Sequence, residues 1–263
     1  MKKQVDLETL YQIIENLQII KAPIAIKGGL LLNASLQEHM SYISRMTRDI
    51  DGNWLHKQPN VHEMKEILEQ AVQMSYPDYT VRIKRNYNER QSAGFEILNH
   101  RQEIVTKLDI DVNKPTIVTP YMINDASFQG VAIEQMLCDK ISVLSSPRIM
   151  RRTKDLLDVY AITQTVPYNK ELLIDLLSKR ELGDFSSLYK RKTDIQYAYD
   201  KLMDITNKPE FEDVYTTVCD YCKNIAIDIT NVKTNHHRDR AADLTQYESL
   251  LQENQQQDEH EFA

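Results

Sequence analysis

A glycine pair, Gly28-Gly29, and the later segment Asp49-Ile50-Asp51 constrain the fold of this chain more than any other feature. The apolar residues 23–26 before the glycines are predicted as a strand, and residues 30–32 after them continue as a helix. Residues 49–55 are predicted as the next strand, and alternation along a strand places both aspartates on one face. Two carboxylates so placed can hold one or two Mg²⁺ ions against a nucleoside triphosphate. This order of elements therefore suggests nucleotidyl transfer.

Nucleotidyl transfer needs a close-approach turn for phosphates and two or three acidic metal ligands, because positioning and electrostatics supply most of the rate. Gly28-Gly29 supplies the turn, since glycine lets the backbone approach a phosphate and the helix that begins near Leu30 presents free N–H groups. Asp49 and Asp51 are the expected metal ligands. A third carboxylate would come from the alternating strand over residues 104–112, and the sequence leaves Asp109 and Asp111 both open.

Composition places the chain among ordinary globular proteins. It has 263 residues, 41% hydrophobic and 27% charged, which suits one large domain or two small ones. No apolar run approaches the roughly 20 residues of a membrane span, and the N-terminus lacks the apolar core of a signal peptide. Three cysteines make no disulfide framework. We expect a cytoplasmic protein with no membrane partner.

The periodicity of the sequence divides the chain into two unlike halves. Apolar residues recur at helical spacing over residues 6–20 and 61–75, whereas three later segments, around residues 80, 95 and 108, alternate as strands do. From about residue 128 nearly everything is helical. We expect an α+β fold with a mixed sheet and flanking helices over residues 1–125, a helical domain over 126–251 that completes the active-site cleft, and a disordered tail over 252–263.

Three segments resemble the AbiEii/AbiGii (abortive infection) toxin family, which includes the MenT-type toxins and lies within the DNA polymerase β-like nucleotidyltransferase superfamily. The first is Lys27-Gly28-Gly29. The second is Arg45-Met-Thr-Arg-Asp-Ile-Asp51, which matches the family pattern R-x-[ST]-x-D-[IL]-D. The third is a helical pair, Glu134–Lys140 followed by Arg152–Tyr160. The resemblance spans residues of about 20–162, and the third segment makes it specific.

The resemblance implies a role for each matching residue. Asp49 and Asp51 would hold Mg²⁺ or Mn²⁺, and Lys140 would reach the triphosphate of a bound NTP. Either Asp158 or Asp155 would be the second essential acidic position, with a slight preference for Asp158, because a spacing of three puts both on one helix face. The candidate nucleotide-binding residues are Lys27, Gly28, Gly29, Arg152, Lys154 and Asp155.

Two further positions of the family motifs carry weaker expectations. Arg45 is interpreted as an ion-pair partner that shapes the edge of the aspartate strand. Leu30 departs from the family, where a Thr or Ser after the glycine pair can bind a phosphate oxygen. Either the backbone amides suffice at this position or the affinity for nucleotide is weaker.

No feature of the sequence by itself identifies the acceptor of the transferred group. The family resemblance implies the 3′ end of tRNA, together with a separately encoded antitoxin. Local clusters of arginine and lysine around residues 82–90, 148–154 and 190–192 suit an RNA backbone, but the net charge of −7 suits a protein hydroxyl nearly as well. A non-catalytic nucleotide-binding module is the third possibility, and Leu30 is the only hint in its favour.

Overall fold

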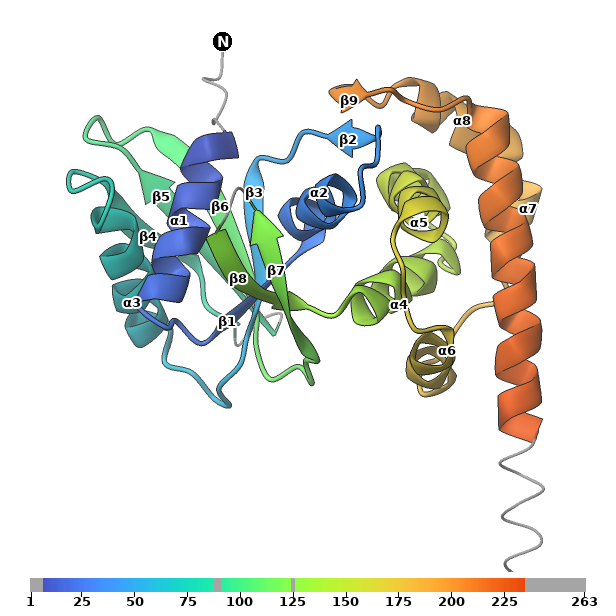
Figure 1. Ribbon diagram of the computed structural model, residues 1–263, viewed down its shortest axis with the longest axis horizontal. Coiled ribbons are helices and arrows are strands. Elements are labelled where there is room, and N and C mark those ends of the chain that lie inside the picture. Colours follow the sequence, from blue (N-terminus) through green and yellow to red (C-terminus); the bar gives the residue numbers. More distant parts are fainter. Residues whose placement is uncertain (1–6, 88–90, 124–125, 235–263) are drawn as a thin grey trace, which may run out of the picture.

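The computed structural model describes residues 7–87, 91–123 and 126–234. A seven-stranded mixed sheet forms one half of these residues, and a group of helices forms the other (Figure 1). Across the sheet the strands are β4 (Thr80–Arg85), β5 (Ser92–Leu98), β6 (Ile104–Asp111), β3 (Asp49–Trp54), β1 (Ile24–Lys27), β8 (Ala126–Val131) and β7 (Val118–Ile123). The expected α+β fold is therefore confirmed. The predicted tail over 252–263 lies outside the described residues.

The central strands of the sheet fix the position of the glycine pair and the aspartates. β1 runs antiparallel to β3 and parallel to β8, while β3 runs parallel to β6. The helix α2 (Gly28–Glu38) begins directly where β1 ends, at the first glycine of the pair. The glycine pair, the first turn of α2 and the aspartate strand therefore lie side by side.

Two helices of the first half pack against each other and against the sheet. These are α1 (Leu7–Ile19) and α3 (Val61–Gln73). α1 buries the helically spaced Leu10, Ile13, Ile14 and Leu17, and the Asn16 amide donates to the Ala71 carbonyl of α3 at 2.8 Å. α3 in turn packs on the edge strand β4. Both helices match the ranges that periodicity predicts.

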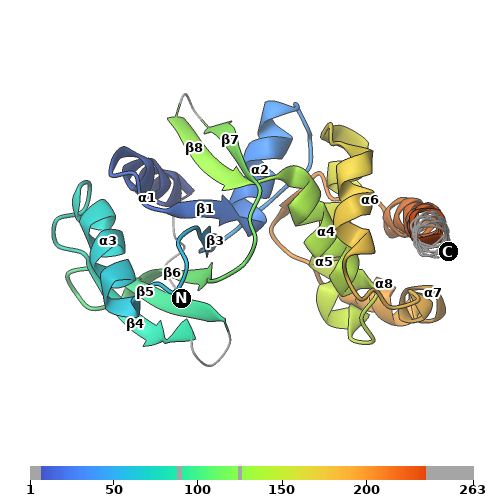
Figure 2. The same cartoon turned by 90° about the horizontal axis from the view of Figure 1, so that it is seen from below.

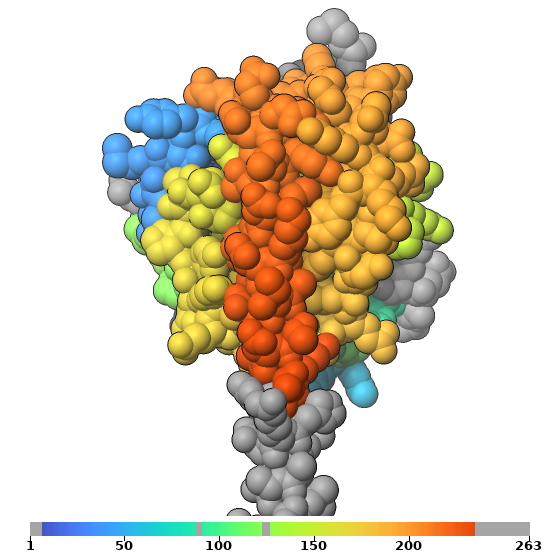
Figure 3. Space-filling view, turned by 90° about the vertical axis from the view of Figure 1, so that its right-hand side faces the viewer, coloured from blue at the N-terminus to red at the C-terminus, as the bar shows by residue number. Residues whose placement is uncertain are grey.

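The second half is helical apart from one short strand. Its elements are α4 (Ile133–Leu144), the 3₁₀ helix η2 (Ile149–Arg152), α5 (Thr153–Thr165), α6 (Lys170–Ser178), α7 (Ser186–Lys190), α8 (Lys192–Asp200), β9 (Ile205–Thr206) and a last helix over residues 211–234. That last helix runs along one side of the molecule, with yellow residues of the α5–α6 range on one flank and orange residues of the α7–α8 range on the other (Figure 3). Of the described helices, none has the length and apolar character that a membrane crossing needs.

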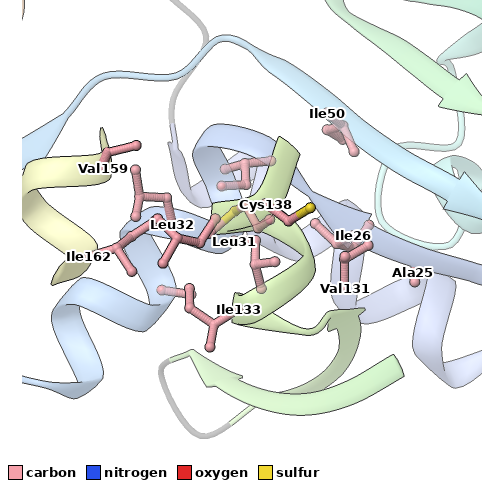
Figure 4. Packing of buried hydrophobic residues seen from close by; sticks show 14 of the residues in the cluster. Ala25, Ile26, Leu31, Leu32, Ile50, Val131, Ile133, Cys138, Val159 and Ile162 are labelled. Atoms are coloured by element: carbon pink, nitrogen blue, oxygen red, sulfur yellow. The ribbon is translucent and has the colours of Figure 1, made fainter. Parts of the chain in front are cut away.

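The two halves share one continuous core. Leu31 and Leu32 of α2 lie among Cys138 of α4 and Val159 and Ile162 of α5, all of them buried (Figure 4). A second connection is the small antiparallel pair of β2 (Ser44–Arg45) with β9. The position of the helical half relative to the aspartate strand is therefore set by packing and by backbone hydrogen bonds.

The sheet extends further along the chain than the sequence indicates. Residues 126–131 form β8, which pairs with β7 and with β1, so the sheet continues past the expected boundary after residue 125. The predicted single helix from Ile149 to Ile162 is a 3₁₀ turn followed by α5. The sequence did not predict β7 and β8 as strands, because apolar and polar residues do not alternate clearly within either segment.

Candidate active site

Backbone register brings the sequence-predicted acidic residues onto one face of the sheet. Lys27 on β1 is opposite Asp51 on β3, and Asp51 is opposite Asp109 on β6. Asp49 lies two residues before Asp51 and therefore shares its face, as Asp111 shares the face of Asp109. Their neighbours on the opposite face, which include Ile50, Leu108 and Ile110, are fully buried in the core.

The first glycine of the pair is required by its backbone and by its neighbour. Gly28 has φ of +70°, a conformation that L side chains rarely adopt, and a Cβ there would come within 2.3 Å of an Asp51 carboxylate oxygen. A Cβ on Gly29 would lie 2.8 Å from the Thr47 hydroxyl oxygen. The pair therefore lets the N-terminal turn of α2 approach the aspartate strand, and leaves its backbone N–H groups beside the carboxylates.

Among the acidic residues of this face, Asp51 is the one whose pKa is raised. Burial raises its pKa to about 6, with help from the Asp109 and Asp49 carboxylates and against the opposing effects of Lys27 and Lys140. Asp49 itself is exposed and forms no ion pair within the described part of the chain. A bound cation between these carboxylates would remove the repulsion that raises the Asp51 pKa.

Asp109 and Asp111 differ in how their charges are already satisfied. Asp111 accepts from both Lys27 and Lys114, and although burial opposes the charged form, these hydrogen bonds lower its pKa. Asp109 keeps half its side chain exposed and accepts one bond from Arg85 at 2.8 Å. Asp109 is thus the more available of the two as a third carboxylate.

A second cluster forms where the helical half meets the first. The Arg45 guanidinium donates two parallel bonds to Asp158, at 2.8 and 2.9 Å, and the Lys140 ammonium donates to Asp158 at 2.5 Å and to Asp155 at 3.3 Å. Asp158 is 1% exposed. Burial opposes its ionisation, but the charges of Lys140 and Arg45 lower its pKa, while the two aspartates raise the pKa of Lys140 despite burial. Arg45, Lys140 and Asp158 are therefore all charged.

The glycine pair lies next to both clusters. A Cβ on Gly28 would come within 2.3 Å of the Asp51 carboxylate, and one on Gly29 would lie 3.2 Å from the Arg45 guanidinium, the partner of Asp158. The predicted Asp49, Asp51 and Asp109 therefore lie on one side of this turn, and Lys140 and Asp158 belong to the cluster on the other. Arg152 and Lys154 are exposed at the N-terminal end of α5, and Arg152 lies 4.0 Å from Asp155.

Three partners in this site were not assigned a role by the sequence. Asn33 on α2 donates to the Arg45 carbonyl at 2.8 Å and accepts from the Arg45 N–H at 3.4 Å, which holds the strand that carries the arginine. A single asparagine within the apolar run of α2 was the signal that could have found it. Lys114 and Arg85, the partners of Asp111 and Asp109, carry no comparable signal. Arg45 does form an ion pair, but with Asp158 and not along its own strand edge.

The donor set suits a divalent cation of the magnesium type. Carboxylate oxygens are the preferred ligands of Mg²⁺ and Mn²⁺, and the raised pKa of Asp51 shows that its charge lacks full compensation. The described residues contain no ready-made group of three or more His, Cys, Asp or Glu side chains arranged around one metal position. The protein carboxylates would therefore be completed by oxygens from a bound triphosphate or from water.

A glycine turn, an aspartate strand and a lysine-bearing helix on a mixed sheet are the features expected of a nucleotidyltransferase. Over residues 14–250 the chain matches the family described as nucleotidyl transferase AbiEii toxin of type IV toxin–antitoxin systems. The chain belongs to this family, which confirms the resemblance drawn from its motifs. No curated protein matches the chain.

Two solved structures from Helicobacter pylori show the same fold. JHP933 from Helicobacter pylori shares 16% identity with a TM-score of 0.54, and the alignment covers 87% of this chain and 94% of that one. MenT4, a nucleotidyltransferase toxin from Mycobacterium tuberculosis H37Rv, is more distant, with 11% identity and a TM-score of 0.41 over 65% of this chain and 62% of that one.

Proposed function

We propose that this toxin-family nucleotidyltransferase moves a nucleoside monophosphate from an NTP to the 3′ end of an RNA, with tRNA as the acceptor, and that a cognate antitoxin counteracts it. The observation that carries this proposal is the position of the glycine turn beside both charged clusters. A Cβ on Gly28 would lie 2.3 Å from the Asp51 carboxylate, and one on Gly29 would lie 3.2 Å from the Arg45 guanidinium, which pairs with Asp158 beside Lys140. A triphosphate placed there would meet both a cation and a pair of metal-binding carboxylates.

Asp49 and Asp51 would hold the divalent cation, with Asp109 as the third carboxylate. When bound, the ion would neutralise the triphosphate oxygens and the charge that develops on the leaving pyrophosphate. Asp111 is better suited to fix the Lys27 ammonium, since it already accepts from two lysines. We therefore favour Asp109 over Asp111 as the third carboxylate, a choice that the sequence left open.

The remaining residues bind and orient the nucleotide. The backbone N–H groups at the start of α2, made accessible by Gly28 and Gly29, would donate to a phosphate, and Lys140 would reach the triphosphate. Asp158 is enclosed by Arg45 and Lys140 and would act by positioning the lysine. The exposed Arg152 and Lys154 would bind outer phosphate oxygens, beside the half-buried Asp155.

Leu30 has a structural explanation that does not count against catalysis. Its side chain is 1% exposed and packs in the core, so this position holds α2 against the sheet. A phosphate would be bound there by backbone N–H groups alone. A lower affinity for nucleotide is the expected consequence, without loss of the catalytic carboxylates.

The experiment uses the full chain with Mg²⁺, each of the four NTPs labelled at the α-phosphate, and total tRNA. Label should enter the RNA fraction, and Asp49→Ala or Lys140→Ala should abolish it while circular dichroism stays unchanged. Lys179→Ala, directly after the last residue of α6, is the matched lysine control, because the Lys179 side chain is 68% exposed. Label in the protein fraction would favour transfer to a protein hydroxyl, and no label with any NTP would favour a non-catalytic nucleotide-binding module.

A further inference from the structure

The polar face of the sheet continues well beyond the aspartates. Register pairing aligns two rows of residues across it, and neighbouring strands in such rows are about 4.8 Å apart. The first row is Lys27, Asp51, Asp109, Gly94 and Arg85. The second row is Asp49, Lys107, Glu96 and Arg82. Each row contains one of the proposed metal-binding carboxylates, Asp51 or Asp49, and ends on the edge strand β4.

A β-bulge increases the positive charge at the end of these rows. The pairing of β4 with β5 shifts between Ile83 and Arg85, so that Lys84 is an extra residue on β4. A bulge re-aims a side chain, and here the Lys84 ammonium comes within 3.8 Å of Glu96, on the polar face. Arg82, Lys84 and Arg85 therefore all reach the same face of an edge strand.

These cations outnumber the acidic groups that they contact. Glu96 accepts from Arg82 at 2.5 Å, and the pKa of Glu96 is lowered first by that bond, with further contributions from Lys84 and Lys107. One carboxylate thus faces three cations. The Arg82 and Lys84 side chains are 56% and 46% exposed, so both can bind a further anion.

We propose that the polar face of β6, β5 and β4 is the acceptor surface of the enzyme and binds the phosphodiester backbone of an RNA strand whose 3′ end reaches Asp49 and Asp51. This inference rests on the proposed function and specifies the surface that would bind the acceptor RNA. The charge of this face is opposite to that of the chain as a whole, and the rows lead continuously from the place of transfer to the sheet edge. Exposed arginine and lysine side chains are the groups that bind phosphates without reading sequence.

The other two basic clusters fit this role less well. Arg152, the last residue of η2, and Lys154, in the first turn of α5, lie near Asp155, which pairs with Lys140 where the triphosphate is proposed to bind. Lys190 and Lys192 lie on α7 and α8 in the helical half, on the side away from β4 to β6 (Figure 2). This second pair is therefore a suitable control for nonspecific charge effects.

The test compares the full-length wild type with Arg82→Gln/Lys84→Gln, in which the amides can still donate to Glu96. Binding of fluorescently labelled total tRNA is followed by anisotropy at several salt concentrations. We expect roughly tenfold weaker binding near physiological salt, and a slope of log K against log salt that is shallower by about 1.4, at about 0.7 for each lost contact to a single strand. The acceptor KM should rise by a similar factor, with an unchanged KM for NTP.

Two further variants keep the result interpretable. The charge-preserving swap Arg82→Lys/Lys84→Arg should bind RNA as the wild type does. The matched control Lys190→Gln/Lys192→Gln also removes two exposed cations two residues apart, one of which pairs with a glutamate, Glu212. It should leave RNA binding unchanged, and thermal unfolding should show that every variant is folded.

The inference and the proposed function can fail separately. If the wild type extends RNA but the Arg82/Lys84 double variant binds and extends it equally well, the acceptor surface lies elsewhere and the inference is overturned. If the control pair weakens binding as much as the Arg82/Lys84 pair, the effect is nonspecific and the inference is again overturned. If the wild type labels only protein, the RNA acceptor of the proposed function is wrong, whatever the binding data show.

Discussion

Arg45 and Asp158 join the two halves of the protein through a bidentate ion pair, with N–O distances of 2.8 and 2.9 Å. Arg45 lies on β2, next to the glycine helix, and Asp158 lies on α5 in the helical half. Fork-to-fork geometry makes this pair directional, so it sets the position of α5 as well as contributing energy. Since Asp158 also accepts from Lys140, the same contact places the proposed triphosphate-binding lysine.

Asp158→Ala should destabilise the protein by about 3–5 kcal/mol, because it leaves Arg45 and Lys140 as two buried cations without their shared partner. Equilibrium unfolding in urea measures this loss. Asp155→Ala is the matched control, since Asp155 is partly exposed and accepts a single 3.3 Å bond from Lys140. It should cost no more than about 1 kcal/mol. Equal losses for the two variants would contradict a structural role specific to Asp158.

Lys140→Met should separate catalysis from folding. In this variant Asp158 keeps both bonds from Arg45, so the buried carboxylate stays paired and the fold persists. NMP transfer should fall by roughly 10²-fold or more, as expected when a group that stabilises developing charge is removed. The readouts are label incorporation and the thermal midpoint. Lys179→Met, at an exposed position, should change neither, and a Lys140→Met enzyme with full activity would exclude the lysine from catalysis.

The fold of the first half could be predicted largely from periodicity. Helical spacing located α1 and α3, and alternation located β4 and β6, because each of these elements has one buried and one polar face. The strand β5 was also located, although six of its seven residues are buried. β7 and β8 were missed for the converse reason. β7 and β8 are stabilised by pairing with each other, and β8 also pairs with β1. Such pairing depends on the tertiary structure and cannot be predicted from a local sequence pattern.

Spacing and family motifs name a candidate set of site residues, Asp49, Asp51, Lys140 and Asp158, but not the contacts that these residues make. They could not show that Asp111 accepts from two lysines while Asp109 remains half exposed, since this depends on Lys114 and Arg85, which lie on a loop and on the edge strand. To choose between Asp109 and Asp111 as the third carboxylate, one must know which cations each of them contacts in the folded protein.

Gly28→Ala should damage the site more than any other small substitution. The positive φ of 70° is strained for alanine, and the new Cβ would lie 2.3 Å from the Asp51 carboxylate. We expect a loss of roughly 1–3 kcal/mol in stability, together with much weaker binding of a fluorescent NTP analogue. Gly94→Ala is the control, because the nearest atom to its Cβ would be at an ordinary 3.4 Å. Normal nucleotide binding by Gly28→Ala would show that the glycine turn does not bind phosphate.

Asp51→Asn should stabilise the metal-free protein at pH 7.5. Burial, reinforced by Asp109 and Asp49, raises the Asp51 pKa to about 6, so the folded state holds this proton more tightly than the unfolded state does. The stability that protonation of Asp51 confers is therefore present in full below pH of about 4 and is lost as the pH rises through about 6. The neutral asparagine escapes this loss, and the gain at pH 7.5 is at most about 3 kcal/mol.

Thermal unfolding in EDTA from pH 4 to pH 8 measures this effect, and a parallel series with Mg²⁺ tests the metal site. The gain from Asp51→Asn should shrink as the pH falls from 7 towards 4. Mg²⁺ should raise the melting temperature of the wild type and have little effect on the variant, because the cation relieves a repulsion that asparagine has already removed. Asp220→Asn, at an exposed helix position, controls for the loss of one negative charge. An Asp51→Asn protein that is less stable than the wild type at pH 7.5 in EDTA would show that Asp51 is compensated by Lys27 and needs no metal.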